Sequence, residues 1–291
     1  MVRLSLAGNA ATLSSDSSSP AHSRTMAPVT LLSWNVAGRT RLFGDQAAAV
    51  ERQDPDLVAL QEVRPSTLPR WRRALANAGL VHCLDSSAFR DSRRLFNLTA
   101  GRWDLTELEP VGAPQPERVL SAVSESPAGQ IEIHNVHVPP TRREGDVKIE
   151  TCEALLERLA RHCSRHRILC GDLNTPRRES TEGEVETFAV DGLPWSERWD
   201  SAERSLACGL AEWDLHDVFR NLNGYERGDV SWVFHTRSRR KAGHRLDHVL
   251  ASRSLDPVWC DYLHELRQAG LSDHSPLLAV FEPAQVLRRS L

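Results

Sequence analysis

The chain has 291 residues, of which 40% are hydrophobic and 26% are charged, and its formal net charge at pH 7 is −3. These values are ordinary for a soluble globular protein with a sizeable core. The small net charge excludes a protein that is basic throughout, so binding of a polyanion must depend on local patches. Lys148 and Lys241 are the only lysines among the 36 basic residues. The arginines suit bidentate contacts with phosphate.

The cysteines and the hydropathy pattern bear on the compartment. None of the six cysteines forms a C-x-x-C pair, and all lie inside apolar patterns, which predicts buried, reduced thiols. No stretch is long enough to span a membrane, and the N-terminus lacks the apolar core of a signal peptide. We therefore expect a cytoplasmic protein with no membrane contact. The cysteines are Cys83, Cys152, Cys163, Cys170, Cys208 and Cys260.

The composition predicts one folded domain between two tails. Residues 1–27 are rich in serine and have little to bury, which is typical of a disordered tail. Met26 is the only methionine besides Met1, and it directly precedes the first convincing strand, so we expect it to be the true start. No Pro/Gly-rich linker divides the rest, and we expect a single domain at 28–284 and a short tail at 285–291.

The first half of the domain alternates strand and helix patterns. The segments 29–36 (VTLLSWNV) and 56–63 (DLVALQEV) have the patterns of buried strands. Between them, residues 45–53 have a helical pattern with Asp45 as a plausible N-cap. A second helix is expected over 68–79, ending at Gly79 in a C-cap position.

The second half adds an alternating strand at 130–138 (QIEIHNVHV) and a long helix from about Asp146 to Cys163. A further helix is predicted at 210–222 (LAEWDLHDVFRNL), and further strands at 167–173, 231–236, 245–252 and 275–282. Neighbouring strands near the C-terminus favour antiparallel pairing, and the mixed order favours two sheets covered by helices over a purely parallel sheet. The order of the strands does not follow from the pattern.

Polar residues occur repeatedly where these apolar strands end. Taken singly, each has an ordinary structural explanation, such as a turn, a cap or a satisfied core histidine. Strands of packed sheets project their ends to a common edge, however, so the repetition predicts one shared site. The residues are Asn35, Glu62, His137, Asp172, Asn174, Asp247, Asp273 and His274.

The chemistry of this set is coherent. Carboxylates without clustered cysteines suit Mg²⁺ or Mn²⁺ better than zinc. A histidine next to a carboxylate suits proton transfer near neutral pH. Hydrolysis of a phosphate diester needs a metal to offset charge, an activated water and donors to the phosphoryl oxygens. The residue set therefore favours a metal-dependent phosphoesterase.

The motifs SWNVAG, LQEV, NVHVPP, GDLNTP, RLDHVLAS and SDHSPLLAVF resemble, in order and spacing, those of the endonuclease/exonuclease/phosphatase superfamily. The resemblance covers about Val29 to Pro283. It implies a DNase I-like fold, an α/β four-layer α-β-β-α sandwich in which two mixed β-sheets are flanked by helices. Within the superfamily, residues 215–252 are most similar to the exonuclease III type of AP endonuclease. Those enzymes carry a tyrosine in a Y-V-P-N motif where this chain reads HVPP, so the substrate stays open.

The resemblance also implies roles for the residues at the strand ends. Glu62 resembles the principal metal ligand, with Asn35 beside it and Asp273 on the metal side. Asp172 and Asn174 resemble the pair that positions the attacking water and contacts the phosphate. His274 resembles the catalytic histidine oriented by Asp247, and His137 resembles a phosphate-contacting histidine of the DNase I and sphingomyelinase branches. The implied cofactor is Mg²⁺, with Mn²⁺ as an alternative.

Arginines and aromatic residues near these motifs are candidates for substrate binding. Arg142 follows HVPPT and Arg177 follows GDLNTP, where a cation can neutralise and steer phosphate. Trp232 and Arg245 belong to the stretch shared with AP endonucleases, and Trp232 is also a candidate for stacking on a base, although tryptophan in such runs is more often part of the core.

These features favour a Mg²⁺-dependent phosphodiester hydrolase, an endo- or exonuclease that acts on DNA in preference to RNA. We expect it to be a monomer with no obligate protein partner. Two alternatives remain: a phosphatase or phospholipid phosphodiesterase of the same superfamily, and a catalytically inactive binding module.

Overall fold

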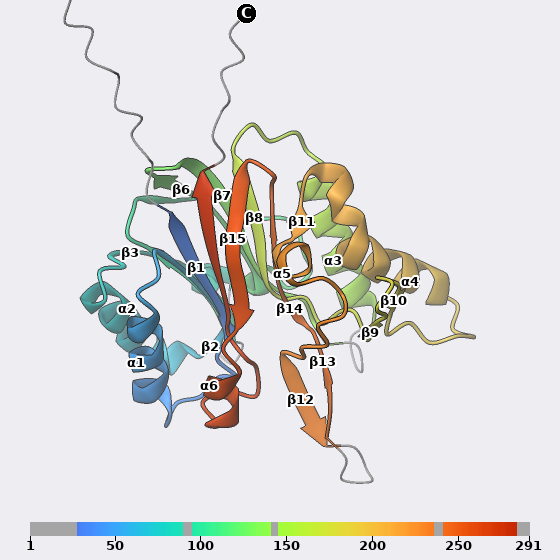
Figure 1. Cartoon of the computed structure of the whole chain (residues 1–291), viewed down its shortest axis with the longest axis horizontal. Coiled ribbons are helices and arrows are strands. Elements are labelled where there is room, and N and C mark those ends of the chain that lie inside the picture. The colour runs from blue at the N-terminus through green and yellow to red at the C-terminus, as the bar shows by residue number, and fades with distance from the viewer. Residues whose placement is uncertain (1–27, 90–94, 141–144, 236–240, 284–291) are drawn as a thin grey trace, which may run out of the picture.

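A computed structural model of the chain describes residues 28–89, 95–140, 145–235 and 241–283. The predicted tails, including the proposed start at Met26, lie outside the described residues. Over the described part the chain forms two large β-sheets with helices on their outer faces (Figure 1). This is the four-layer α-β-β-α arrangement expected, and the predicted fold class is confirmed.

The first sheet has six described strands in the order β15-β16-β1-β2-β4-β3. β1 and β2 are parallel, and the other neighbours are antiparallel. The strand bounds are β1 Val29–Asn35, β2 Leu57–Val63, β3 His82–Asp85, β4 Phe96–Gly101, β15 Leu255–Tyr262 and β16 Leu277–Pro283.

The second sheet also has six described strands, in the order β11-β14-β8-β7-β6-β5, of which β7 and β8 are parallel. The strand bounds are β5 Leu105–Glu107, β6 Val119–Ser126, β7 Gly129–His137, β8 His166–Asp172, β11 His216–Asp217 and β14 Asp247–Ala251. Two small two-stranded sheets complete the described strands: β9 Arg178–Glu179 with β10 Val185–Glu186, and β12 Trp232–His235 with β13 Lys241–His244.

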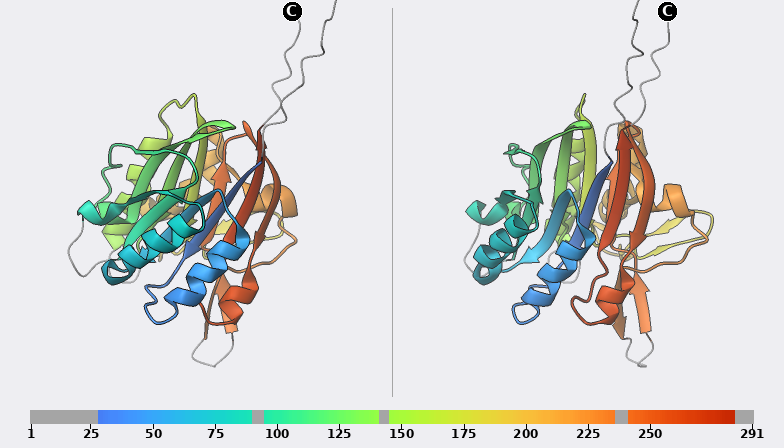
Figure 2. Two further views of the ribbon diagram at one scale, coloured as in Figure 1. Left: turned by 90° about the vertical axis from the view of Figure 1, so that its left-hand side faces the viewer. Right: turned by 60° about the vertical axis from the view of Figure 1, so that its left-hand side comes forward.

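Alternating side chains on the strands explain the layers, because every second residue of a strand points to the same face. Leu31 and Ala59 of the first sheet belong to one buried cluster with Ile133 and Ile168 of the second, and this cluster joins the sheets. The opposite face of the first sheet packs on α1 (Phe43–Gln53), α2 (Leu68–Asn77) and α6 (His264–Gln268). The opposite face of the second packs on α3 (Gly145–Leu159) and α4 (Ser196–Arg204). Figure 2 shows α1 and α2, in blue and cyan, over the first sheet.

Shorter helical segments connect these layers. α5 Val218–Asn223 lies against β14 and β15. The remaining segments are the 3₁₀ turns Pro65–Thr67, Ser86–Phe89, Pro116–Arg118 and Leu210–Trp213, and the π-helical turn Ser205–Gly209. No helix in the described ranges is long and apolar enough to cross a membrane.

Several local predictions were wrong at their boundaries. Helix α1 begins at Phe43, so Asp45 lies within the first turn, and Leu42 holds the N-cap position. Helix α3 ends at Leu159, four residues before Cys163. The helix predicted at 210–222 is interrupted at Asp214, whose φ of 57° is left-handed and ends the first turn before β11. Periodicity does not reveal such a left-handed break.

The thiols also depart in part from the prediction. All six cysteines are free, but Cys208 is exposed, and Cys83 and Cys163 are only partly buried. Cys208 falls in the π-helical turn after α4, in which Leu206 is the buried residue.

Candidate active site

Three neighbouring strands of the second sheet bring polar residues into one row. In the strand register, Asp172 of β8 is paired with His137 of β7 on one side and with Asp247 of β14 on the other. Asp172 shares its face with Ile168 and Cys170, which are part of the cluster between the sheets. The three polar side chains therefore extend the buried inner face at its end.

Glu62 reaches this row through a break in the alternation of β2. Gln61 already points between the sheets, since its Nε2 donates to Asn135 Oδ1 of β7 at 2.8 Å. Regular alternation would turn Glu62 outward, but its φ is +58°, and the register with β4 shifts between Leu60 and Val63. A non-glycine residue with this φ is strained, and such strain is concentrated at functional sites. Glu62 Oε1 consequently lies 3.5 Å from His137 Nε2 of the other sheet.

Asn35, at the end of β1, connects the two sheets. Its Nδ2 donates to Asp172 Oδ2 at 3.0 Å and to Glu62 Oε1 at 3.3 Å. Its Oδ1 accepts from the Ala37 backbone N at 2.9 Å, which fixes the orientation of the amide. Asn35 and Asp172 are buried, and Glu62 is partly exposed. Glu62 and Asn35, two of the three residues predicted for the metal side, thus form one contiguous group with Asp172.

His274 approaches from the loop before β16. Its Nδ1 lies 2.8 Å from Asp247 Oδ2, and its Nε2 lies 3.8 Å from Asp172 Oδ2. The backbone of Asp247 is itself fixed, because its N donates to Ser231 Oγ at 3.0 Å and its carbonyl accepts from the Tyr262 hydroxyl at 2.6 Å. The predicted pairing of the acid and the imidazole is present.

Charges dominate the chemistry of this buried group. Burial raises the pKa of Asp172 above its ordinary 3.8, and the charges of Asp247 and Glu62 add to the rise, while His274 opposes it. Burial would lower the pKa of His274, but attraction to Asp247 and Asp172 outweighs it and raises that pKa to about 10. The imidazole is therefore cationic at neutral pH.

The site fits a hard divalent cation. Glu62 and Asp172 present carboxylate oxygens of the kind that Mg²⁺ prefers, whereas Asn35 turns its Nδ2 towards both of them. Ligand atoms of Asp172, Asp247 and His274 also lie within 4.8 Å of one another. Burial is the main cause of the raised pKa of Asp172, and the repulsion from Asp247 and Glu62 that adds to it is one that a cation would offset.

His137 lies beside this group and contacts an arginine. Arg118 Nη1 is 2.9 Å from His137 Nδ1, and His137 Nε2 is 3.8 Å from Asp172 Oδ2. Burial is the main cause that lowers the pKa of His137 well below 6.5, and the charges of Arg118 and His274 lower it further. His137 is thus a neutral imidazole next to two cationic groups.

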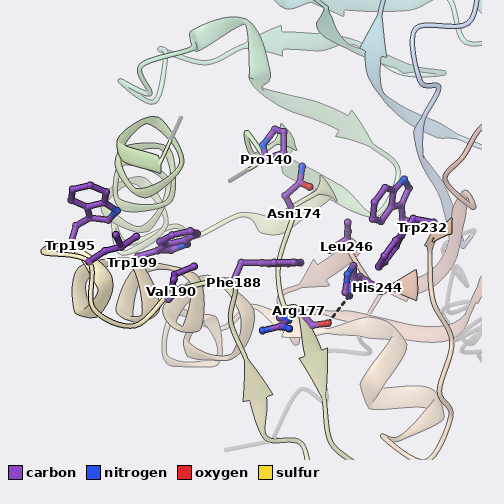
Figure 3. Close-up of a pocket in the computed structure, with 13 residues that line it drawn as sticks. Pro140, Asn174, Arg177, Phe188, Val190, Trp195, Trp199, Trp232, His244 and Leu246 are labelled. Atoms are coloured by element: carbon purple, nitrogen blue, oxygen red, sulfur yellow. Dashed lines mark hydrogen bonds between the residues drawn. The ribbon is translucent and has the colours of Figure 1, made fainter. Parts of the chain in front are cut away.

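A cavity of about 870 Å³ opens beside the candidate catalytic loop, the segment after β8 that carries Asn174. In Figure 3, Asn174 and Pro140 lie on one side of it, while Trp232 and Trp199 lie at opposite ends with Phe188 between them. Its lining is mainly apolar and aromatic. The complete lining comprises Pro140, Asn174, Arg177, Phe188, Ala189, Val190, Leu193, Trp195, Trp199, Trp232, Phe234, His244 and Leu246.

Trp232 lies between this cavity and the buried charged group that includes His274. Its ring stacks on Phe234 with centroids 5.0 Å apart, and Phe234 stacks in turn on His244 at 5.2 Å. The Trp232 and His274 rings have centroids 6.3 Å apart. The cavity therefore presents aromatic surface directly next to the candidate catalytic histidine.

The other predicted residues have varied positions. Asn174 has a φ of +49°, and its side chain donates to the Val138 carbonyl at 2.8 Å. Arg177 lines the cavity and pairs with Glu186 at 2.9 Å. Asp273 is exposed and accepts from Trp232 Nε1 at 3.2 Å, which places it on the cavity side of His274. Arg142 lies outside the described residues.

The structure argues against the substrate-binding role predicted for Arg245. Its side chain is buried, and it donates to Glu179 at 2.7 and 2.6 Å and to Asp217 at 2.7 Å. Two carboxylates therefore already balance its charge. The guanidinium stabilises the region next to β14, the strand that carries Asp247. Sequence position alone does not distinguish such a buried arginine from one that faces a phosphate.

Sequence reasoning missed two residues of this region. Ser272 Oγ donates to the Asn35 carbonyl at 2.6 Å and accepts from the His274 backbone N, so it joins the histidine loop to β1. Its position two residues before His274 in the S-D-H motif was the available signal. Arg118 lies far from every motif, and only the pairing of β6 with β7 brings it to His137.

Comparison with known structures identifies the fold. An AP endonuclease from Archaeoglobus fulgidus is 20% identical, with a TM-score of 0.65 over 87% of this chain and 99% of that one. Humanized D. rerio TDP2 is 18% identical, with a TM-score of 0.63 over 88% and 99%. An endonuclease/exonuclease/phosphatase from Beutenbergia cavernae is 18% identical, with a TM-score of 0.60 over 88% and 72%. The fold is thus that of the DNase I-like phosphoesterases.

The sequence places the chain more narrowly. Residues 32–274 match the Endonuclease/Exonuclease/phosphatase family, and the chain belongs to that family. The predicted resemblance is confirmed. No curated protein matches the sequence.

Proposed function

We propose that this protein is a Mg²⁺-dependent phosphodiester hydrolase that acts on nucleic acid, with DNA preferred over RNA. The observation that carries the proposal is the buried group of Asp172, Asp247 and His274 in contact with Asn35. Members of the family hydrolyse phosphoester bonds, and an AP endonuclease and a TDP2 bound to a single-strand DNA product share the fold.

In this proposal the chain's own residues have distinct tasks. Glu62 would hold Mg²⁺, with Asn35 beside it orienting the Glu62 and Asp172 carboxylates, and the ion would supply positive charge to the phosphate. Asp172 accepts a proton from the attacking water, since its raised pKa lies closer to neutral pH than that of an ordinary aspartate. Cationic His274 donates from Nε2 to a phosphoryl oxygen, and Asp247 holds its Nδ1 side.

The cavity supports a nucleic-acid substrate. Aromatic rings beside a scissile phosphate can stack on bases, and each stacked base contributes roughly 1–3 kcal/mol. Arg177 is the arginine in the cavity lining, so affinity for an extended duplex backbone is not expected.

The test is hydrolysis of labelled single-stranded, duplex, abasic and RNA oligonucleotides with Mg²⁺ and with EDTA. We expect Mg²⁺-dependent cleavage of at least one DNA substrate, which Glu62→Ala, Asp172→Ala and His274→Ala each abolish. Full activity in all three variants would refute the site.

A phosphatase or phospholipid phosphodiesterase is the second candidate, because neutral His137 and the apolar cavity also suit a lipid phosphoester. Turnover of inositol phosphates or of sphingomyelin vesicles, with every nucleic acid left intact, would favour it over the nuclease.

A further inference from the structure

A fully buried ion pair lies behind the catalytic loop and forms no part of the catalytic group. Lys148 of α3 and Glu203 of α4 contact each other, and both side chains are 0% exposed. Burial of two charges carries a desolvation penalty that attraction alone often fails to repay. The attraction between Lys148 and Glu203 is therefore a weak reason for the pair, and their other contacts are more informative.

Lys148 holds the backbone of the catalytic loop. Its Nζ donates to the carbonyl of Asn174 at 2.7 Å. Asn174 is one of the strained residues of the site, with a φ of +49°, and strained residues persist only where their surroundings fix them. The backbone N of Asn174 also donates to Asp172 Oδ1 at 3.0 Å, so displacement of this residue would reach the catalytic carboxylate.

Glu203 holds both the loop and the cavity wall. Oε2 accepts from Thr175 Oγ1 at 3.0 Å and from the Phe188 backbone N at 2.8 Å. Oε1 accepts from Trp199 Nε1 at 2.6 Å, besides its contact with Lys148. With four donors, the acceptor sites of this carboxylate are filled.

The two sides of the cavity therefore share one support. Asn174 belongs to the loop that carries the catalytic groups, and Phe188 and Trp199 form the facing apolar wall (Figure 3). The Lys148 ammonium also lies 5.1 Å from the centroid of the Phe188 ring. Helices α3 and α4 alone could pack with apolar residues, as they do elsewhere in their shared cluster.

We infer that Lys148 and Glu203 are positioning residues that fix the position of the catalytic loop relative to the aromatic wall of the cavity. The pair thereby sets how a substrate that occupies the cavity meets Asp172 and Asn174. The effect on catalysis rests on the proposed function. The positioning of the loop and the cavity wall rests on the contacts alone.

The test compares Lys148→Met with the double variant Lys148→Met/Glu203→Gln. The single variant leaves a buried carboxylate without its cation and is expected to lower the melting temperature. The double variant removes both charges and should recover only part of the stability, because the amide in Glu203→Gln cannot accept from Thr175, Phe188 and Trp199 together, and it still lacks the donor to the Asn174 carbonyl. Leu155→Ala is the matched control, since Leu155 is fully buried on the same helix and has no part in this network.

We expect kcat/KM on the best oligonucleotide substrate to fall about 10- to 100-fold in both Lys148 variants, because small displacements of catalytic groups have effects of this size. Leu155→Ala should keep its kcat/KM at temperatures where it is folded. Parental kcat/KM in the double variant, or an equal loss in Leu155→Ala, would overturn the positioning role.

A second readout does not depend on catalysis. In amide and indole NMR spectra, Lys148→Met should shift the Asn174 backbone signal and the Trp199 indole signal, and leave the indole of Trp71, which packs under the other sheet, unchanged. Unmoved Asn174 and Trp199 signals would refute the inference. If these signals move but the parent cleaves no phosphoester, the contacts stand and the proposed function fails.

Discussion

The pairing of His274 with Asp247 predicts that loss of the Asp247 charge lowers both the pKa of His274 and the activity. Asp247→Asn removes the negative charge from an aspartate whose Oδ2 lies 2.8 Å from His274 Nδ1 and whose side chain is 2% exposed. The backbone contacts of Asp247 with Ser231 and Tyr262 do not involve the carboxylate, so they persist in the variant. The change therefore tests the charge rather than the position of the strand.

The magnitude follows from the electrostatics of the histidine. The rise of its pKa from 6.5 to about 10 corresponds to about 5 kcal/mol of net attraction for the charged imidazole. Asp247 is its nearest carboxylate, so we expect the pKa of His274 in Asp247→Asn to fall by about 2 or more. With the imidazole less often cationic and less firmly oriented, kcat/KM at neutral pH should fall about 10²- to 10⁴-fold.

The assay combines kcat/KM between pH 5 and 9 with an NMR titration of the His274 ring, and uses exposed Asp256→Asn as the control. In Asp247→Asn the remaining activity should fall further above pH 7, where the unpaired imidazole loses its proton. A folded variant with activity within threefold of the parent, or with an unchanged His274 titration, would refute the reasoning.

Three further outcomes are expected. Mg²⁺ should stabilise the folded parent by about 2.7 kcal/mol at 100 times its Kd and so raise its melting temperature, and Glu62→Ala should abolish this rise in thermal scans with and without EDTA. Gly171→Ala should fail to give soluble, folded protein, because a Cβ at this φ of +129° would lie 2.0 Å from the Val136 carbonyl oxygen; a normal melting curve would contradict this. Burial raises the pKa of Glu179, but contacts with Arg245 and Arg220 outweigh burial and lower this pKa to about 2. The ionised Glu179 therefore contributes about 3 kcal/mol to the free energy of unfolding above pH 4.5, and this contribution is lost as the pH falls towards 2. Glu179→Gln should therefore flatten acid unfolding in that window, and an unchanged acid transition would count against the role of this ion pair.

Much of the site could be predicted because strand ends are visible in the sequence. Apolar runs that end in Asn35 and Asp172, or that begin after Asp247, indicate residues at strand ends, and the S-D-H motif before a core strand points to His274. Period-two alternation then predicts which neighbours lie between the sheets. Helix boundaries were less accurate, since the left-handed residue Asp214 leaves no trace in hydrophobic periodicity.

Other features depended on contacts between distant segments. Glu62 faces the site only because a register shift and a positive φ reverse its direction. Arg245 belongs to a buried ion-pair network, whereas Arg118, far from any motif, lies against His137.

The sequence by itself determined the family, the two-sheet architecture and the residue types at the strand ends, because local periodicity and short motifs encode them. Tertiary structure alone decided the charge state of His274, the aromatic cavity beside it and the support from Lys148 and Glu203. The physical reason is that pKa values, cavities and buried ion pairs arise from groups far apart in the chain whose burial and separation exist only after folding.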